Sequence, residues 1–351
     1  MTVEVVASDY QAQQIRIAAI TSNQILGLWG RVTGADISAS WGSVAPAAAV
    51  VLARGQVQAA ALADGYLDSV SAAFGGASFA NGPVYAAGFG GAASDGRNLS
   101  GMLEAAVVAS KNAISAGASV QSALQSGGAV MRVMATSQVA DAGRTAVSVA
   151  MFTRDEPAPA SAQPFKGPGG RMYVRDGNGR TVPHFRAQSY VRFVNAGACS
   201  RCIILAGKRY EKQSPFLRHP HCHCTHIPID ENLDDYPATD PNAYYEGLSE
   251  AEKIKALGKA GVKAIDAGAD MNQVVNARQG IYQTDDGRLA TRMGTTKRGL
   301  YGSSQTEFTK TGAKSKYGRT VQARLMPEEI FKIAPTREDA LRLLRHYRYI
   351  I

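Results

Sequence analysis

Apolar residues recur at helical spacing through most of the first 150 residues. Ile17, Ile25 and Leu28 lie on one face of a helix that begins near Ser8, where Ser8 and Gln11 form a capping-box start. Ala-rich segments with the same helical character follow at 44–74, 99–114 and 120–151. The Gly-rich interruption 75–96 has no lasting period and lacks a phosphate-binding GxxxxGK[ST] motif. The pattern therefore predicts a helical domain over residues 1–151.

The pattern changes after residues 152–170, which are rich in Pro, Ala and Gly and predict an interdomain linker. Segments 171–175 and 180–185 flank the turn sequence DGNG and predict a β-hairpin. Alternating residues at 190–194 predict another strand. Two later helices are predicted from a capping box at Ser249 and an N-cap at Thr336. The fold class expected is α+β, with residues 171–351 forming a small mixed α/β domain that ends in a helix.

The composition predicts helices that pack through small residues. Hydrophobic residues make up 45% of the chain, but only 7% is aromatic, and Ala and Gly dominate the apolar fraction. Residues 1–150 hold 7 Lys and Arg against 8 Asp and Glu, so the net charge of +9 belongs to the rest of the chain. The N-terminus lacks a signal-peptide pattern, and the longest apolar run, 44–53, is too short to span a bilayer. We therefore expect no membrane partner and a reducing cytoplasm during folding.

All four cysteines fall within 26 positions, in a CxxC pair followed by a CxC pair flanked by histidines. A CxxC turn brings two thiolates to one metal ion, and a second pair of sulfur or nitrogen ligands completes a tetrahedron. The 19-residue gap between the pairs is typical of zinc sites. The sequence thus predicts one bound Zn²⁺. Its candidate ligands are Cys199, Cys202, Cys222 and Cys224, with His219 as the alternate ligand.

Three other interpretations compete with the zinc site. A disulfide is disfavoured in a reducing cytoplasm, a redox CxxC leaves the second pair unexplained, and buried thiols need no histidines. The site is expected to be closed and structural, because neither HExxH nor HxE…PCxxC occurs. Surface or supporting positions are expected for His221, His223 and His226, and structural roles for His184 and His346.

The run GACSRCIILAG…FLRHPHCHCTHIP, residues 197–228, resembles the cysteine/histidine core of phage Mu F-like minor head proteins, in the branch found in tailed phages of actinobacteria. Segments 93–103, 268–280, 294–299 and 324–333 and the closing LRLLRHYRYI fit the same branch, so the resemblance covers most of the chain. The family pattern places its ligands at Cys199, Cys202, His219, Cys222 and Cys224. This chain differs in carrying His223 between the last two cysteines.

The resemblance implies a minor capsid protein needed for head morphogenesis, located in the virion head and, during assembly, in the host cytoplasm. Its implied partners are the portal protein and other phage head proteins, and its helical domain would face the portal or capsid. This branch is often labelled capsid maturation protease, which is the first alternative function. The residues themselves provide no GxSxG or Ser-x-x-Lys nucleophile motif, so no catalytic residue is assigned.

A second alternative is contact with the phage genome DNA, delivered with the protein. Segment 286–324 is strongly basic and contains interleaved aromatic residues that could stack on bases. A solvated basic loop, or one that binds an acidic face of the portal, is the plainer interpretation. The candidate phosphate contacts are Arg288, Arg292, Lys297, Arg298, Lys310, Lys314, Lys316 and Arg319, together with Arg324 at the end of the segment.

Overall fold

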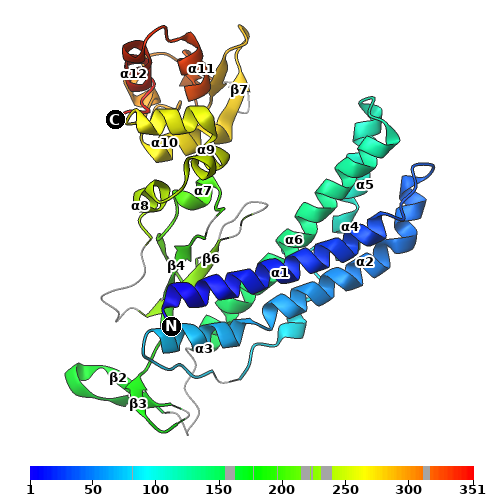
Figure 1. Cartoon of the computed structure of the whole chain (residues 1–351), viewed down its shortest axis with the longest axis vertical. Coiled ribbons are helices and arrows are strands. Elements are labelled where there is room, and N and C mark those ends of the chain that lie inside the picture. Colours follow the sequence, from blue (N-terminus) through cyan, green and yellow to red (C-terminus); the bar gives the residue numbers. More distant parts are fainter. Residues whose placement is uncertain are drawn as a thin grey trace. The chain divides into compact units, whose positions relative to one another are not determined.

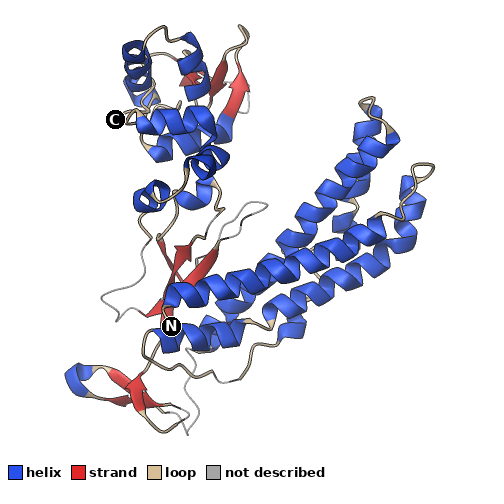
Figure 2. Cartoon of the chain, in the orientation of Figure 1, coloured by secondary structure: helices blue, strands red, loops and turns tan. Residues whose placement is uncertain are grey.

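The computed structural model describes residues 1–80, 82–154, 163–176, 178–195, 197–214, 222, 224–230, 239–310 and 317–351. The chain divides into two compact units, the first formed by 1–195 with 207–238 and the second by 196–206 with 239–351. Long helices dominate the N-terminal part and small sheets follow them, which confirms the α+β class (Figures 1 and 2). The predicted linker 152–170 lies inside the first unit, and its residues 155–162 are outside the described part of the chain.

Three long helices lie side by side in the first unit: α1 (Val3–Trp29), α2 (Ile37–Ala60) and α6 (Val120–Thr153) (Figure 1). The shorter helices are α3 (Ala63–Ala73), η1 (Ala86–Phe89), α4 (Leu99–Leu103) and α5 (Ala105–Ser115). The stretch Ile37–Ala73 is long and apolar enough, by length and composition alone, to cross a membrane. It is longer than the apolar run 44–53 that the sequence singled out, and one of its faces packs against α1 and α6.

Small residues let these helices approach closely, as the composition predicts. A Cβ atom at Gly55 would lie 2.3 Å from Oγ1 of Thr21, so α1 and α2 have no room for a larger side chain there. Trp29 at the C-terminal end of α1 and Trp41 near the start of α2 pack with their ring centroids 5.5 Å apart. The Trp29 indole also donates a hydrogen bond to the Leu124 carbonyl oxygen at 3.0 Å. Close contacts at small residues therefore accompany large buried side chains such as Leu52 and Met131 in the core of this bundle.

Two antiparallel sheets complete the first unit. The predicted hairpin is confirmed as β2 (Met172–Arg175) and β3 (Thr181–Pro183). β1 (Phe165–Lys166) pairs with the other edge of β2 and is linked to it through the turn η3 (Pro168–Gly170). The second sheet has the order β5-β4-β6, with β4 (Ala187–Phe193), β5 (Arg209–Glu211) and β6 (Thr225–Asp230). Buried residues of β4 and β6 share one core with the N-terminal end of α1, with α3 and with the C-terminal end of α6. The strands are therefore part of the helical unit's core.

The second unit combines short helices with two small sheets. The capping box at Ser249 and the N-cap at Thr336 lie where the sequence predicts, at the starts of the helices Glu250–Asp266 and Arg337–His346. The sheets have the orders β11-β8-β7 and β10-β9. Its helices are α7 (Ser200–Ile203), α8 (Pro241–Glu246), α9 (Glu250–Asp266), α10 (Met271–Ala277), η4 (Arg278–Gly280), η5 (Gly302–Ser304), α11 (Pro327–Ile333) and α12 (Arg337–His346). Its strands are β7 (Ile281–Gln283), β8 (Leu289–Thr291), β9 (Phe308–Thr309), β10 (Arg319–Thr320) and β11 (Arg324–Leu325).

Candidate metal centre

The CxxC pair belongs to a single helical turn. Cys199 is the N-cap residue of α7, and the backbone N–H of Ile203 donates to its carbonyl oxygen at 3.0 Å. Residues three apart on a helix lie on the same face. The Sγ atoms of Cys199 and Cys202 are accordingly 3.5 Å apart. This is the geometry that two thiolates need to reach one metal ion.

The CxC pair directly precedes β6. Cys222 and Cys224 are both buried, with exposed fractions of 6% and 3%. Side chains two apart on an extended chain point to the same side, so their sulfur atoms can converge. Thr225, the first residue of β6, pairs with Phe193 of β4. This pairing fixes the position of the backbone directly after Cys224.

The ligand atoms of Cys202, Cys222 and Cys224 all lie within 4.8 Å of one another, and all three residues are buried. This cluster could hold a metal ion. Three sulfur donors with the nearby Cys199 thiol would form the thiolate-rich set that zinc and other soft metals prefer. The structure thus brings together three of the five predicted ligands, places Cys199 beside Cys202, and leaves His219 outside the described residues.

Cys202 and Cys224 have the disulfide-bonded form in the structure. This differs from the sequence-based expectation of reduced thiols. A disulfide and a metal–thiolate centre are alternative states of the same sulfur atoms, because only a deprotonated thiolate binds the metal. The metal content of the protein and the oxidation state of its cysteines therefore have to be measured on the same sample.

A buried arginine of α6 binds the backbone of the CxC segment. Nη2 of Arg144 donates to the carbonyl oxygens of Cys222 at 2.7 Å and Cys224 at 2.9 Å, and Nε donates to Cys224 at 3.1 Å. Burial lowers the pKa of Arg144, and the neighbouring Cys222 opposes this shift. Nη1 lies 3.6 Å from the Asp141 carboxylate. The cysteine segment is therefore anchored to the helical bundle through its main chain.

His226 does not lie on the surface. Its side chain is 1% exposed in β6, where its ring packs 5.0 Å from that of Tyr190. Burial, and secondarily the charges of Arg144 and Arg192, lowers the pKa of His226 to about 3, so the imidazole is neutral at physiological pH. The Tyr66 hydroxyl donates to the His226 carbonyl oxygen at 2.9 Å. This histidine is a core residue next to the cluster, while His221 and His223 lie outside the described residues.

The other two isolated histidines have ordinary surroundings. His184 follows β3, and its backbone N–H donates to the Met172 carbonyl oxygen at 3.0 Å. Burial is the main cause that lowers its pKa. Within the described residues, no serine or cysteine side chain hydrogen-bonds to His184, so no nucleophile–base pair is formed there. The His346 ring makes an edge contact with Tyr347, with centroids 4.8 Å apart.

The basic segment is only partly available for phosphate contacts. Arg288 forms an ion pair with Asp286, and Arg292 stacks on the Tyr282 ring at 5.2 Å. A guanidinium nitrogen of Arg319 donates to the Arg292 carbonyl oxygen. Exposed positions with no ion pair among the described residues are Lys297, Arg298 and Lys310, while Lys314 and Lys316 lie outside the described residues. Arg324 is 1% exposed, so its inclusion in the basic surface is wrong.

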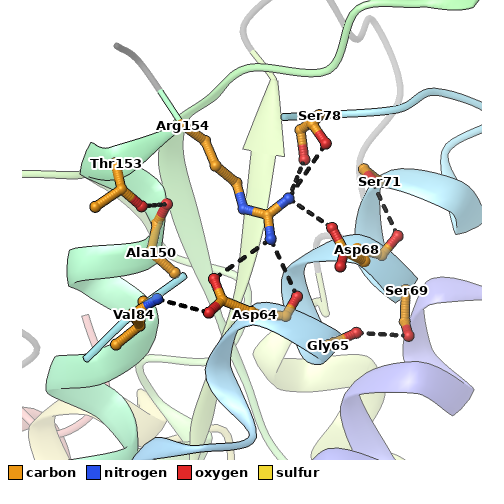
Figure 3. Close-up of polar contacts among 10 residues, drawn as sticks. All are labelled: Asp64, Gly65, Asp68, Ser69, Ser71, Ser78, Val84, Ala150, Thr153 and Arg154. Atoms are coloured by element: carbon orange, nitrogen blue, oxygen red, sulfur yellow. Dashed lines mark hydrogen bonds and ion pairs between the residues drawn. The ribbon is translucent and has the colours of Figure 1, made fainter. Parts of the chain in front are cut away.

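A second buried arginine, not anticipated from the sequence, closes α6. The guanidinium of Arg154 contacts the carboxylates of Asp68 at 2.5 Å and Asp64 at 3.5 Å and the Ser78 hydroxyl at 2.9 Å (Figure 3). Asp64 also accepts a hydrogen bond from the Val84 backbone. The group ties α3, α6 and the loop after α3 together. In the sequence, Arg154 is a charged residue that follows an apolar helical segment. Arginines at solvated helix ends have the same pattern, so the sequence does not predict that Arg154 is buried.

Comparison with known proteins adds no assignment: no family model, no curated protein and no solved structure matches this chain.

Proposed function

We propose that this chain is a structural component of a tailed-phage head, stabilised by a structural zinc ion on its cysteine cluster. The observation that carries the metal part is the burial of Cys202, Cys222 and Cys224 with their ligand atoms within 4.8 Å of one another. A catalytic metal keeps an open position for water or substrate, whereas a closed, buried set of thiolates favours a structural ion. Zinc binding would add folding free energy on the order of 10 kcal/mol at such a site.

The donor chemistry supports zinc and fits the residues present. Cys202, Cys222 and Cys224 would supply three sulfur ligands, and Cys199 or His219 the fourth. The anchoring by Arg144 supports the same proposal, because hydrogen bonds that orient the ligand-bearing backbone are typical of metal sites. The ion would join segments that are about twenty residues apart in sequence, which is a structural role.

The phage-head part of the proposal rests on the resemblance of residues 197–228 and the shorter segments to Mu F-like minor head proteins. A helical unit rich in small residues suits packing against helices of a portal or capsid partner. The protease alternative receives less support, since no nucleophile–base pair is found among the described residues. Incubating the purified chain with the scaffold and major head protein of its phage tests that alternative, and cleavage would favour it.

Metal content of the purified, reduced chain is the deciding experiment. We expect about one zinc per chain, protection of the cysteines from thiol reagents until a chelator is added, and a lower melting temperature after chelation. Thiols should be counted in parallel with and without reductant. A metal-free protein with one stable disulfide and an unchanged melting temperature under chelation would reject the zinc proposal. Co-purification with the portal protein of the same phage tests the head assignment separately.

DNA contact remains a second proposed function, favoured by one observation. Lys297 and Arg298 are adjacent, exposed and without an ion pair among the described residues. Charge-driven binding releases counterions and is steeply salt-dependent. We expect weak binding to double-stranded DNA at low salt that disappears at moderate salt. The double variant K297E/R298E should weaken it, whereas the same change at the exposed Lys255 and Lys259 of α9 serves as a matched charge control. Binding that persists unchanged as salt rises contradicts the proposal.

A further inference from the structure

The sheet β1-β2-β3 of the first unit has two faces of different character. Side chains directly opposite each other in an antiparallel pair lie on the same face. The register places Phe165 opposite Tyr173 and Tyr173 opposite Pro183, so these three residues form one row across the sheet. Val174 belongs to the other face and is fully buried. We call the face with Phe165, Tyr173 and Pro183 the aromatic face.

The aromatic face offers a ring to solvent. Phe165 is 41% exposed, and its ring stacks on that of Tyr173 with the centroids 6.4 Å apart. A Cβ atom at Gly167 would lie 2.3 Å from Cδ2 of Tyr173, so the Tyr173 ring packs directly on the glycine backbone. The Tyr173 ring is thereby held in place beside Phe165. An exposed ring that is supported by a second ring is a surface on which a further flat ring can stack.

Two arginines flank the row of rings. Arg171 and Arg175 lie two residues before and two residues after Tyr173 on extended backbone, and side chains two apart on a strand point to the same face. Both arginines are exposed, and neither forms an ion pair among the described residues. Arg175 donates to the Gly179 carbonyl oxygen at 3.0 Å, which leaves its charge uncompensated. The aromatic face therefore has a positive charge on each side of its rings.

The charge of the whole segment favours an anionic ligand. Residues 163–186 contain five Lys and Arg residues and one acidic residue, Asp176. Asp176 is paired with Arg180 at 2.8 Å, so it does not compensate the other cations. A field of one sign attracts ligands of the opposite sign. The ligand that suits this face is consequently negative and carries flat rings.

Single-stranded nucleic acid has both properties in every residue. Its phosphates pair with arginine, and its bases are free to stack on aromatic side chains, which small sheets with exposed rings use in other proteins. In a duplex the bases are already stacked on one another, so they are not free for Phe165. An acidic peptide offers the charge without a regular supply of rings. The aromatic face thus favours a single strand over either of these.

We propose that the aromatic face binds single-stranded nucleic acid, with one base stacked on Phe165 and the neighbouring phosphates bound by Arg171 and Arg175. The proposal uses neither the cysteine cluster nor the phage-head assignment. It also does not depend on Lys297 and Arg298, since its evidence is the row of rings and the two flanking guanidinium groups.

The test measures binding of the full-length protein to two end-labelled strands by fluorescence anisotropy. One is oligo(dT) of about 12 nucleotides, and the other is an abasic strand of the same length, which has the same phosphates and no bases. We expect saturable binding of oligo(dT) that is at least about 5-fold tighter than that of the abasic strand, the lower limit for stacking of one base. Because both strands carry the same charge, the contribution of basic residues elsewhere in the chain cancels from this ratio.

Substitutions of Phe165 locate the stacking. F165A should bring the affinities for the two strands together, whereas F165Y keeps an aromatic ring and should keep the preference for oligo(dT). F152A is the matched control, because Phe152 at the end of α6 is 44% exposed and lies outside this sheet. It should leave the preference intact. Circular dichroism of each variant verifies the fold.

Substitutions of the arginines test the phosphate contacts. R171E/R175E should weaken binding of both strands and make it less dependent on salt, because fewer counterions are released. The same change of charge in R16E/R54E, at exposed arginines of α1 and α2, is the control and should have a smaller effect on both quantities.

Three results would overturn the proposal. The first is equal affinity of the wild-type protein for oligo(dT) and the abasic strand, since the bases would then make no contact. The second is a preference for oligo(dT) that survives in folded F165A, which would move the stacking elsewhere. The third is a polyglutamate peptide of the same length that displaces labelled oligo(dT) more effectively than unlabelled oligo(dT) does. That result would assign the aromatic face to an acidic protein.

Discussion

Arg144 binds Cys222 through the main chain: its Nη2 atom donates to the Cys222 carbonyl oxygen at 2.7 Å. A side chain of the long helix α6 therefore fixes the backbone that presents a candidate metal ligand. The contact does not depend on the state of the sulfur atom. It is the structural basis for the first prediction.

Replacing Arg144 by Met should destabilise the protein by about 3 kcal/mol, because two buried carbonyl oxygens lose their charged donor. It should also weaken metal retention, since the ligands are then less well oriented. Chemical denaturation and competition with a chromogenic chelator measure the two effects. R132M, at an exposed arginine of the same helix, is the control and should change neither. Unchanged metal retention in folded R144M would show that Arg144 does not position the ligands.

Arg154 should matter for stability through its bonds with Asp68 and Asp64. Its side chain is 5% exposed, whereas those of the aspartates are 61% and 27% exposed, so water screens part of the interaction. We expect R154M to lower the free energy of unfolding by about 2 kcal/mol, measured in urea. The exposed Arg97–Asp95 pair is the control, and R97M should have no measurable effect. Equal effects of the two substitutions would contradict the buried role of Arg154.

The second unit should depend on Arg324. Its guanidinium donates to the carbonyl oxygens of Tyr347 at 2.9 Å, Met293 at 3.1 Å and Arg348 at 3.1 Å. It also lies 4.4 Å from the centroid of the Tyr349 ring. Substitution by Met leaves these oxygens without a donor, and we expect a loss of about 3 kcal/mol.

Hydrogen exchange should place the effect of R324M in residues 239–351. The same variant should bind DNA as the wild type does, because the side chain is buried. R298M is the converse control, with unchanged stability. A fall in DNA affinity caused by R324M without any loss of stability would contradict the structural role.

Alkaline pH should destabilise the second unit through Tyr301. Burial raises the pKa of this phenol to about 12, whereas a tyrosine in the unfolded chain titrates near 10. Between these values the unfolded state releases a proton that the folded state keeps, so stability falls as pH rises from about 10 to 12. Urea midpoints across this range measure the slope.

The Y301F variant should show a shallower fall, because it removes one of the tyrosines with a raised pKa. Its stability at neutral pH should not decrease, since the Tyr301 hydroxyl has no hydrogen-bond partner among the described residues. A slope identical to that of the wild type would show that other groups cause the alkaline transition.

Local signals in the sequence predicted the helix starts of the second unit well. The capping box predicted at Ser8 is wrong, because α1 begins at Val3 with Thr2 as its N-cap. The capping box of Ser249 and Glu252 lies at the start of α9, and Thr336 caps α12, because caps act through the backbone of the same turn. The CxxC and CxC spacings likewise identified sulfur atoms that converge, since short loops restrict where their side chains point. These features depend on neighbours in the chain.

Contacts between distant segments were not predictable in the same way. No motif in the sequence singles out Arg144 or Arg154, yet one binds the CxC segment and the other binds α3. Likewise Arg324 reads as part of a basic surface, although it is buried among carbonyl oxygens. A sequence pattern gives the charge of an arginine, but only the tertiary fold supplies its acceptors.

The placement of Trp29 and Trp41 makes the tryptophan fluorescence of this protein sensitive to one region of the fold. These are the only two tryptophans in the chain, and they pack against each other in the core of α1, α2 and α6 away from the cysteines. Emission excited at the red edge of the absorption band therefore monitors one end of the helical bundle. Tryptophan fluorescence is therefore not expected to detect loss of metal or unfolding of residues 239–351. Tyrosine fluorescence or circular dichroism should be measured beside it.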